Sequence, residues 1–281
     1  MTSRGVSISL AGGLGNQLFQ WAAAYSLSRR LNVALAVETR NIERFDSSLS
    51  RRKYELDYFS ISRPRYHPRI IEKILHRAQT LGISADHVFR ESGFRFDRQI
   101  DRVQAGTRLV GYFQSWRYFS HYETEIREIL SDGATPKPDS HVLRQKLEGK
   151  SWIGVHVRRG DYLNFPEIFS ILDGSYYSRS LDFLGVSETD EIVVFSEDIE
   201  DAKALVPQGT IFADSRTISH PGDVVTLLAK ADHVVGANSS LSWWGAYLND
   251  IEGAKKVFPS LWFGPKGWPT DDLIPATWTT L

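Results

Sequence analysis

Cysteine is absent from the 281 residues, and methionine occurs once. Without a thiol, the chain has no disulfide framework, no thiolate nucleophile and no cysteine-ligated zinc site. The formal net charge is −1, from 33 Lys and Arg against 34 Asp and Glu, so no global attraction to nucleic acid or to an anionic membrane is expected. No run approaches the roughly 20 apolar residues that span a bilayer, and no secretory signal is visible. We therefore expect a cytoplasmic protein that binds no nucleic acid and has at most peripheral membrane contact.

The composition is typical of a globular protein of more than one domain. Apolar residues make up 42% of the chain and aromatic residues 12%, with eight tryptophans. At about 150 residues per domain, the length suggests two medium domains or one large one. Aromatic side chains can stack on sugars or bases, although a tryptophan-rich core is the commoner reason for such a composition.

Short β-rich runs alternate with segments of helical periodicity, which predicts an α/β protein. Segment 131–139 contains Pro and Gly without an apolar period, so we expect it to link two domains, 1–135 and 136–281. The predicted strands are 6–10, 33–37, 108–112, 152–157, 192–195 and 233–236, and the predicted helices are 16–31, 122–130, 141–147, 223–231 and 241–248.

Residues 51–79 form a basic stretch, with eight Lys and Arg against three Asp and Glu. The favoured interpretation is a solvated surface with one amphipathic helix. The alternative is contact with a membrane surface or with an acidic acceptor.

Three loops that follow predicted strands carry residues suited to binding an anion, and ligands bind outside the carboxyl ends of strands in open α/β sheets. The first runs from Gly12 to Gln17. Its glycines allow close backbone approach to a ligand, and the helix behind it offers free N–H groups. A dinucleotide fingerprint would need a third glycine at position 18, which is leucine. A tight strand-to-helix turn would have the same composition.

The second loop is His156-Val-Arg-Arg-Gly-Asp161, at the end of a buried strand. An arginine fork suits bidentate capture of phosphate, and Asp161 could orient one of the two arginines. Alternation along a strand places His156 and Arg158 on one face and Arg159 on the other. An Arg–Asp pair that stiffens the loop explains the motif equally well.

The third loop, Gly236 to Gly245, brings hydroxyl and N–H groups together at a helix start, in Asn238, Ser239 and Ser240. Such a helix start binds anions, although Ser and Asn are also ordinary N-cap residues. Together the three loops indicate a site for a multiply charged phosphate. No Asp-x-Asp motif and no paired histidines at helical spacing occur, so we expect arginine and a helix dipole to replace a metal ion, with no cofactor.

The order of these motifs resembles the α-1,2-fucosyltransferases of glycosyltransferase family 11 over nearly the whole chain. The most specific segments are the Gly-Gly-Leu-Gly-Asn-Gln start and the Ser-Ser-Leu-Ser-Trp-Trp motif; Leu241 is a departure, since an aromatic residue is usual there. The other shared segments are 111–115, 154–162, 195–198 and 262–263.

The resemblance implies a GT-B fold, in which two Rossmann-like domains face each other across a cleft. It also implies GDP-fucose as the donor, inversion at the fucose anomeric carbon, no metal, and a galactoside acceptor glycan such as a lactose-type oligosaccharide. The C-terminal domain of such enzymes holds the nucleotide, and the N-terminal domain faces the acceptor.

The same resemblance implies roles for particular residues. Arg158 would pair with the β-phosphate and stabilise GDP as it leaves, and Ser239 and Ser240 would hold the same diphosphate. Asn16 would be catalytic, reaching the glycosidic oxygen or the acceptor hydroxyl across the cleft. Further substrate contacts are expected from residues in the same motifs: Gly13, Gly15, Gln17, Arg159, Asp161, Ser196, Glu197, Asn238 and Leu241.

Several alternatives stay open. Guanine needs a carboxylate for its N1 and N2 hydrogens, and Asp198 and Asp214 are equal candidates. His156 could be a base or a ribose contact, or a core histidine at a strand end. A fucosyltransferase of another linkage or acceptor and a non-catalytic nucleotide- or glycan-binding module are the rival functions. The missing third glycine argues against an NAD oxidoreductase.

Overall fold

The computed structural model describes residues 5–39, 42, 52–62, 87–187 and 189–281, and of Asp161 it describes the backbone only. The described chain forms two compact units. One holds the residues up to Asp57 and from Ile61 to Ile126, and the other holds Tyr58–Ser60 and Arg127–Leu281. Most of the basic stretch 51–79, from residue 63 on and at Arg51, lies outside the described residues.

The change from one unit to the other falls inside a helix. Helix α4 (Glu123–Asp132) begins in the first unit and ends in the second, whereas the sequence points to a boundary after residue 135. The Arg127 guanidinium lies 4.3 Å from the centre of the Tyr247 ring, so the second half of α4 packs with the second unit. The sequence-based boundary differs because Pro- and Gly-rich composition identifies a loop, whereas tertiary packing determines to which unit each part of a helix belongs.

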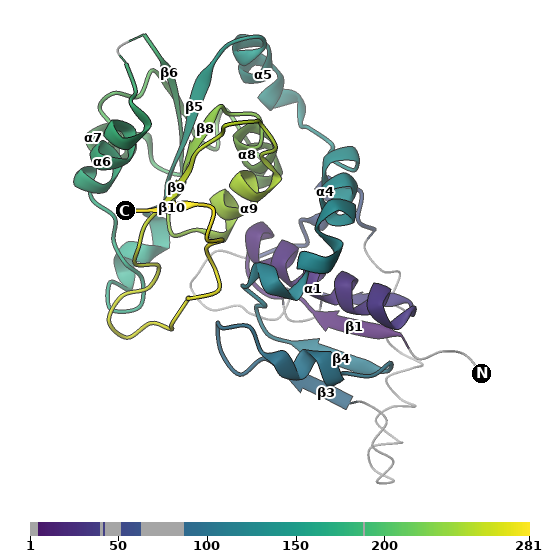
Figure 1. The fold of residues 1–281 in the computed structure, drawn as a ribbon. Helices are drawn as coiled ribbons and strands as arrows, with labels where there is room; N and C mark the ends of the chain where they lie inside the picture. Colours follow the sequence, from purple (N-terminus) through teal and green to yellow (C-terminus); the bar gives the residue numbers. More distant parts are fainter. Residues whose placement is uncertain (1–4, 40–41, 43–51, 63–86, 188) are drawn as a thin grey trace. The chain divides into compact units, whose positions relative to one another are not determined.

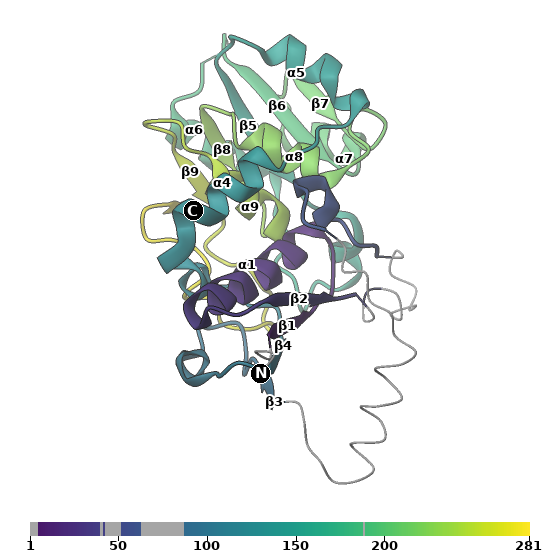
Figure 2. The same cartoon turned by 90° about the vertical axis from the view of Figure 1, so that its right-hand side faces the viewer.

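The first unit is a parallel sheet of order β2-β1-β4-β3. The side chains of Val6 and Ile8 are fully buried, as alternation along an apolar strand requires. Helix α1 crosses from β1 to β2 and lies along the sheet in Figure 2. The strands are β1 (Val6–Ser9), β2 (Leu35–Glu38), β3 (His87–Arg90) and β4 (Thr107–Val110), and α1 is Leu14–Leu31.

The second unit is a parallel sheet of order β10-β9-β8-β5-β6-β7 (Figure 1). Counted along the chain from β5, this is the strand order 3-2-1-4-5-6 of the Rossmann fold, read from the β7 edge. The strands are β5 (Trp152–Val157), β6 (Glu191–Ser196), β7 (Ile211–Ala213), β8 (His233–Val235), β9 (Lys256–Phe258) and β10 (Thr279–Thr280). The helices are α5 (His141–Leu147), α6 (Gly174–Leu184), α7 (Ile199–Leu205), α8 (Pro221–Leu228) and α9 (Ser240–Leu248).

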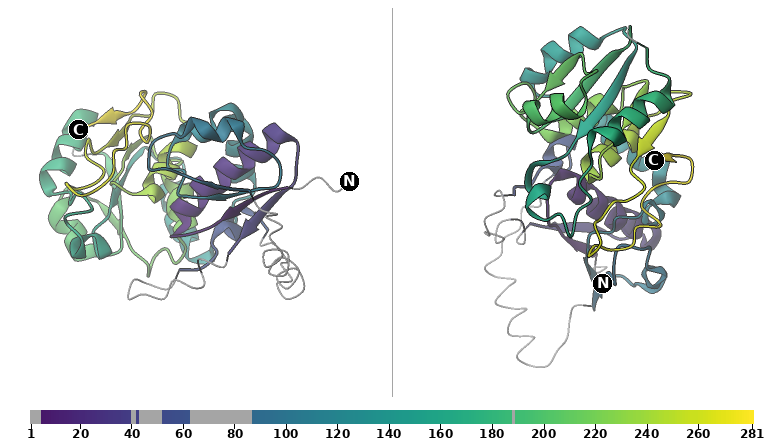
Figure 3. Two further views of the ribbon diagram at one scale, coloured as in Figure 1. Left: turned by 90° about the horizontal axis from the view of Figure 1, so that it is seen from below. Right: turned by 90° about the vertical axis from the view of Figure 1, so that its left-hand side faces the viewer.

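Both faces of the second sheet are covered, α6 and α7 lying on one face and α8 and α9 on the other (Figures 1 and 3). Ile153, Val155 and Val157 of β5 join the core cluster that contains Tyr176 and Tyr177 of α6. On the other face, a side chain at Gly154 would clash with Leu228 of α8. A six-residue strand buried on both faces explains the continuous apolar run that predicted β5. Two Rossmann-like α/β units are the components of a GT-B fold, and the predicted fold class is confirmed.

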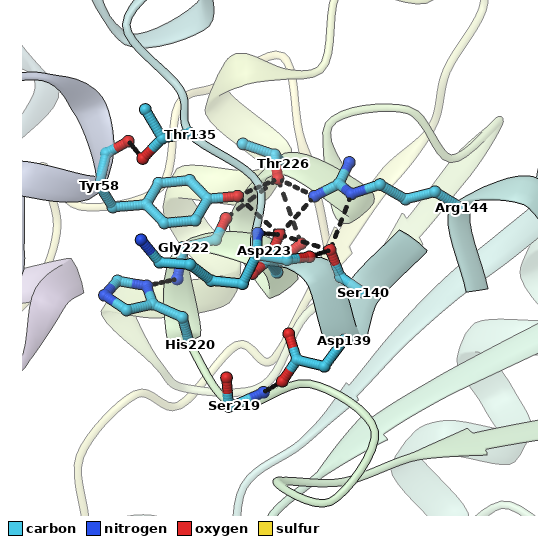
Figure 4. Close-up of polar contacts among 11 residues, drawn as sticks. Tyr58, Thr135, Asp139, Ser140, Arg144, Ser219, His220, Gly222, Asp223 and Thr226 are labelled. Carbon is cyan, nitrogen blue, oxygen red and sulfur yellow. Dashed lines mark hydrogen bonds and ion pairs between the residues drawn. The ribbon is translucent and has the colours of Figure 1, made fainter. Parts of the chain in front are cut away.

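Segment 58–60 packs with the second unit because Tyr58 inserts there (Figure 4). Its hydroxyl donates to Asp223 Oδ1 at 2.8 Å, and its ring stacks on His220 with ring centres 4.8 Å apart. Asp223 is fully buried and also accepts hydrogen bonds from Ser140 Oγ and Arg144 Nη2, both at 2.8 Å. A buried carboxylate needs such partners, since desolvating an unpaired charge is costly. The cluster thus ties the chain between Asp57 and Ile61 to α5 and α8.

Among the described residues, no helix combines the length and the hydrophobicity that crossing a lipid bilayer requires.

Candidate functional site

The predicted phosphate-binding residues of the second unit meet at the carboxyl ends of neighbouring strands. Strand β5 pairs with β6 on one side and with β8 on the other. The order of strands along the chain reverses between β5 and β8, and such a switch point is where open α/β sheets bind ligands. Arg158 follows β5, and Asn238 follows β8 after two residues. The structure therefore brings the second and third predicted loops together.

Contacts with Glu197 and Tyr162 hold Arg158 at this edge. Its guanidinium forms an ion pair with Glu197, which follows β6, and it lies 5.1 Å from the centre of the Tyr162 ring. The side chain is largely buried. A guanidinium has five N–H donors in a rigid fork, and the pair with Glu197 orients this fork.

Arg159 points to other partners. Its Nε lies 3.4 Å from Asp201 Oδ2 of α7, and its Nη1 donates to the Leu172 carbonyl at 3.4 Å. The two arginines therefore diverge, as strand alternation predicts, but the observed carboxylate partner of Arg159 is Asp201. Asp161 lies in the 3₁₀ turn Gly160–Asn164, and its side chain is outside the described structure.

Gly160 makes the pair between Arg158 and Glu197 sterically possible. Its φ is +35°, and a side chain there would clash with the Glu197 carboxylate. A glycine is required both by this backbone angle and by the close approach of Glu197.

His156 is buried on β5. Burial, and secondarily the positive charge of Arg158, lower its pKa to about 3. Its Nδ1 is buried without a hydrogen-bond partner among the described residues. The imidazole is therefore neutral near pH 7 and a weak base, which favours the core-histidine interpretation over a catalytic base.

The carboxylates considered for guanine each have a partner within the protein. Asp198 is the N-cap of α7 and accepts hydrogen bonds from the N–H groups of Glu200 and Asp201, at 2.9 and 3.0 Å. Ser196 Oγ closes the same turn by donating to the Asp198 carbonyl at 2.8 Å.

Asp214 follows β7 and pairs with Arg216 at 2.6 Å. Burial raises the pKa of Asp214, but hydrogen bonds from Arg216 outweigh this and lower it. The choice between Asp198 and Asp214 as a guanine ligand stays open.

Asn238 joins three segments of the second unit. Its side chain is fully buried, and its Nδ2 donates to the carbonyls of Ser170 and Trp262, both at 2.8 Å. Its own carbonyl accepts a hydrogen bond from the Tyr162 hydroxyl at 3.1 Å. The structure therefore gives Asn238 a positioning role. Direct contact with a substrate, the sequence-based prediction, stays a prediction.

The start of helix α9 fits both interpretations of its sequence, as an ordinary N-cap and as an anion-binding helix start. Ser239 is the N-cap, and its Oγ accepts a hydrogen bond from Leu241 N at 3.3 Å. Ser240 and Leu241 form the first turn and are only partly buried, whereas Trp243 and Trp244 are fully buried. The serine hydroxyls thus lie at the positive end of the helix dipole, and the paired tryptophans belong to the core.

The candidate residues of the first unit lie at the corresponding switch point of its sheet, between β1 and β4. Asn16 follows β1, and its Oδ1 accepts a hydrogen bond from Gln114 Nε2, beyond β4, at 2.8 Å. Gly12 has φ +77°, and a side chain there would clash with the Asn16 amide. The glycine turn and Gln114 together set the orientation of the Asn16 side chain.

Gln17 is fully buried and ties the glycine turn to segment 53–55. Its Nε2 donates to the carbonyls of Gly12 and Lys53 at 3.0 and 2.8 Å, and its Oε1 accepts from Glu55 N at 3.0 Å. Burial raises the pKa of Glu55, against which a hydrogen bond from Leu14 N–H acts. The Glu55 carboxylate thus partly offsets the positive end of the helix dipole at the start of α1. Gly13 is the N-cap and Gly15 lies buried in the first turn.

Sequence reasoning missed two residues that shape this edge. Gln20 accepts a hydrogen bond from Ala11 N and donates to the Gly111 carbonyl, both at 3.0 Å. Glu91 Oε2 accepts hydrogen bonds from the N–H groups of Tyr112 and Phe113 at 2.8 Å. Phe113 has φ +53°, so this carboxylate stabilises a strained turn directly before Gln114. Burial raises the pKa of Glu91 to about 7. Gln20 is the last residue of the family-like segment that begins at Gly12, three positions after Gln17, whereas no local signal pointed to Glu91.

Within the described ranges, no three His, Asp or Glu side chains form a group that could hold a metal ion. Independence from metal and from cofactors stays a prediction.

The chain is similar to several known transferases. It is 27% identical to an α-1,2-colitosyltransferase of Escherichia coli, over 97% of either chain. It is 28% identical to the O-antigen biosynthesis glycosyltransferase WbnK of Escherichia coli, over 90% of this chain and 93% of that one. It is 24% identical to galactoside α-(1,2)-fucosyltransferase 2 of Oryctolagus cuniculus, over 86% of this chain and 66% of that one.

Among solved structures, fucosyltransferase NodZ from Bradyrhizobium is 16% identical, covers 88% of this chain and 93% of its own, and has a TM-score of 0.48. Because this score is below 0.5, the two parallel sheets rather than this likeness establish the fold. The family model for glycosyl transferase family 11 matches residues 5–263. The chain therefore belongs to glycosyl transferase family 11.

Proposed function

We propose that the chain is an inverting, metal-independent α-1,2-fucosyltransferase. It moves fucose from GDP-fucose to the 2-hydroxyl of a terminal galactoside, such as a lactose-type oligosaccharide. The observation that carries the proposal is that Arg158 and the Ser239–Ser240 helix start follow neighbouring strands, β5 and β8, at the switch point of the second unit, in a chain of this family.

The chemistry needs positive charge where the diphosphate leaves. Fucosyl transfer passes through an oxocarbenium-like state, as glycoside hydrolysis does. Negative charge then builds on GDP, and fixed donors at that point lower the barrier. The Arg158 fork, oriented by Glu197, and the N-terminus of α9 supply such donors without a metal ion.

No strong base is required if the bond to the donor breaks first, because the acceptor hydroxyl becomes strongly acidic only when it bonds to the oxocarbenium carbon. It attacks the face opposite the leaving GDP, so its proton can pass to water. This fits the low pKa of His156, which makes it a poor base. Asn16 is a neutral amide and cannot be a base either. We assign it to orienting the reacting oxygens, and the Gln114 hydrogen bond sets its side-chain orientation.

Colitosyl transfer is a second candidate, favoured by the similarity to the α-1,2-colitosyltransferase. Colitose is fucose without the 3-hydroxyl. A site built to hydrogen-bond a hydroxyl rejects the analogue that lacks it by about 10⁴–10⁵, whereas an apolar site discriminates far less. The donor preference therefore reports whether polar groups of the protein contact that position.

The test is incubation of the purified protein with lactose and either GDP-fucose or GDP-colitose. Mass spectrometry detects transfer, and NMR of the product gives the linkage. An α-1,2-fucosylated product supports the proposal, and exclusive 3-, 4- or 6-linkage refutes the assigned linkage. Transfer from GDP-colitose alone replaces the first candidate by the second. Binding of GDP without turnover of either donor would leave a nucleotide-binding module.

A further inference from the structure

Two loops of the second unit form a single, firmly built surface beside Arg158. Residues 160–169 follow β5 by two positions, and residues 261–268 follow β9 by two positions. Gly264 N donates to the Ile168 carbonyl at 2.8 Å, and Lys266 N donates to the Glu167 carbonyl at 2.9 Å. Phe169 and Phe263 add an antiparallel bridge. These two segments are called the loop pair below.

The loop pair is anchored to the candidate phosphate site. Asn238, one residue before the N-cap of α9, donates to the carbonyls of Ser170 and Trp262 at 2.8 Å. The Tyr162 ring, which lies beside the Arg158 guanidinium, stacks on Phe169 with ring centres 3.9 Å apart. The loop pair is thus continuous with the residues proposed to hold the diphosphate.

The loop pair exposes an unusual amount of apolar surface. Of the eight large apolar side chains that are exposed in the described part of the chain, four lie on it, with exposed fractions from 39% to 68%: Leu163, Phe165, Leu261 and Trp268. Concentration of exposed apolar side chains on a surface beside a binding site is typical of a ligand-contacting surface. Trp268 packs edge-on against Phe263, with ring centres 5.3 Å apart.

The charge of the loop pair favours a neutral ligand. It holds one lysine against one aspartate and one glutamate, and Lys266 forms an ion pair with Glu167. A protein surface that binds an anionic membrane typically carries an excess of Lys and Arg beside its apolar side chains. A galactoside has no charge, and one face of its ring consists of C–H groups that pack on a flat aromatic ring.

From this we infer that the loop pair binds the acceptor sugar, with Trp268 as the stacking residue and Phe165 as a further contact. The inference rests on the proposed function and extends it, because the second unit then contributes to acceptor specificity as well as to donor binding. Asn238 is the positioning residue that holds the surface.

The test compares Trp268→Ala and Trp268→Tyr with Phe183→Ala, an exposed aromatic on α6 outside the loop pair. Three quantities are measured: KM for lactose, GDP affinity by calorimetry, and hydrolysis of GDP-fucose without acceptor. We expect Trp268→Ala to raise KM about tenfold, the order of one aromatic contact. In Trp268→Ala, GDP affinity and GDP-fucose hydrolysis should stay within about twofold of the wild type. Trp268→Tyr should have a KM for lactose close to that of the wild type, and Phe183→Ala should change none of the three quantities.

An unchanged KM in Trp268→Ala overturns the inference. Equal losses of GDP affinity and of transfer also overturn it, since they would place Trp268 in the donor site or in the core. A separate co-sedimentation assay uses phosphatidylglycerol vesicles. Vesicle binding by the wild type that is lost in Trp268→Ala, at unchanged KM, would show a membrane contact instead.

Saturation-transfer NMR with lactose separates this inference from the proposed function. If the wild type turns over neither donor, the proposed function fails. A lactose signal that disappears in Trp268→Ala still supports the acceptor surface, and equal signals in wild type and Trp268→Ala refute it.

Discussion

Replacing Asn238 by alanine tests whether this residue positions loops or contacts a substrate. The side chain is fully buried and donates two hydrogen bonds of 2.8 Å to main-chain carbonyls. A buried acceptor left without its donor costs about 1–3 kcal/mol. Two such losses predict a destabilisation of about 2–4 kcal/mol for Asn238→Ala, reduced from the full sum because water can reach part of the opened space.

The assay is thermal unfolding followed by circular dichroism, together with calorimetry of GDP binding at a temperature where the variant is folded. For a domain of this size about 2–4 °C of Tm is lost per kcal/mol, so Tm should fall by roughly 5–15 °C. GDP affinity should fall less than KM for acceptor rises, because the loops released are those of the proposed acceptor surface.

Asn249→Ala is the matched control. Asn249 is also buried and its Nδ2 donates to two carbonyls, those of Leu228 and Ala231, at 3.2 and 2.7 Å, but it follows α9 at the other end of that helix. It should lose a similar amount of stability and keep wild-type kinetic constants while folded. If Asn238→Ala unfolds at the wild-type temperature yet loses GDP affinity, the positioning role is refuted and Asn238 is a direct substrate contact.

Four further perturbations test other parts of the account. Arg158→Ala should be folded and nearly inactive, with kcat reduced more than GDP affinity, whereas Arg159→Ala should be milder in kcat; a worse kcat for Arg159→Ala would reverse the two assignments. Because burial raises the pKa of Glu91 to about 7 from 4.5, the folded state keeps a proton that the unfolded state releases, and stability should fall as pH rises through this window by up to about 3 kcal/mol. In Glu91→Gln, the stability measured by urea unfolding should no longer fall by this amount between pH 5 and pH 7.5. A fall as large as in the wild type would mean that another group causes it. Transfer in excess EDTA should stay within about twofold of the untreated rate, and loss restored by Mg²⁺ or Mn²⁺ would contradict the charge argument. Tyr58→Phe should cost about 1 kcal/mol of stability in urea unfolding, since the buried Asp223 keeps its other donors, and a loss above about 3 kcal/mol would mean that the cluster collapses.

Local periodicity was sufficient for the strongest elements. The bounds of β5 and of α5 are those that the apolar pattern predicts. Helix α1 begins two residues earlier than predicted, at Leu14, because Gly13 has the extended backbone of an N-cap. Boundaries depend on such cap geometry, which the apolar pattern does not encode.

Several other elements were missed or misinterpreted, among them the 11-residue helix α6 (Gly174–Leu184). Strands β7 and β9 went unrecognised; each has three residues, but so has β8, which was predicted, so length alone does not explain the miss. Helix α7 went unrecognised although its N-cap, Asp198, was noticed as a candidate guanine ligand. An aspartate can either cap a helix or bind guanine. Only the observed hydrogen bonds from Glu200 N and Asp201 N show that Asp198 caps α7.

The sequence by itself determined the class of the fold, the loops that carry polar groups and the family motifs, because each is written in adjacent residues. Only the tertiary structure decided the partners of those groups. Gln114 bonds to Asn16 across 98 positions, Tyr58 to Asp223 across 165, and Glu197 to Arg158 across 39. Such pairings follow from which strands lie side by side in a sheet. That order depends on how whole helices and strands bury their apolar faces together, so no local pattern specifies it.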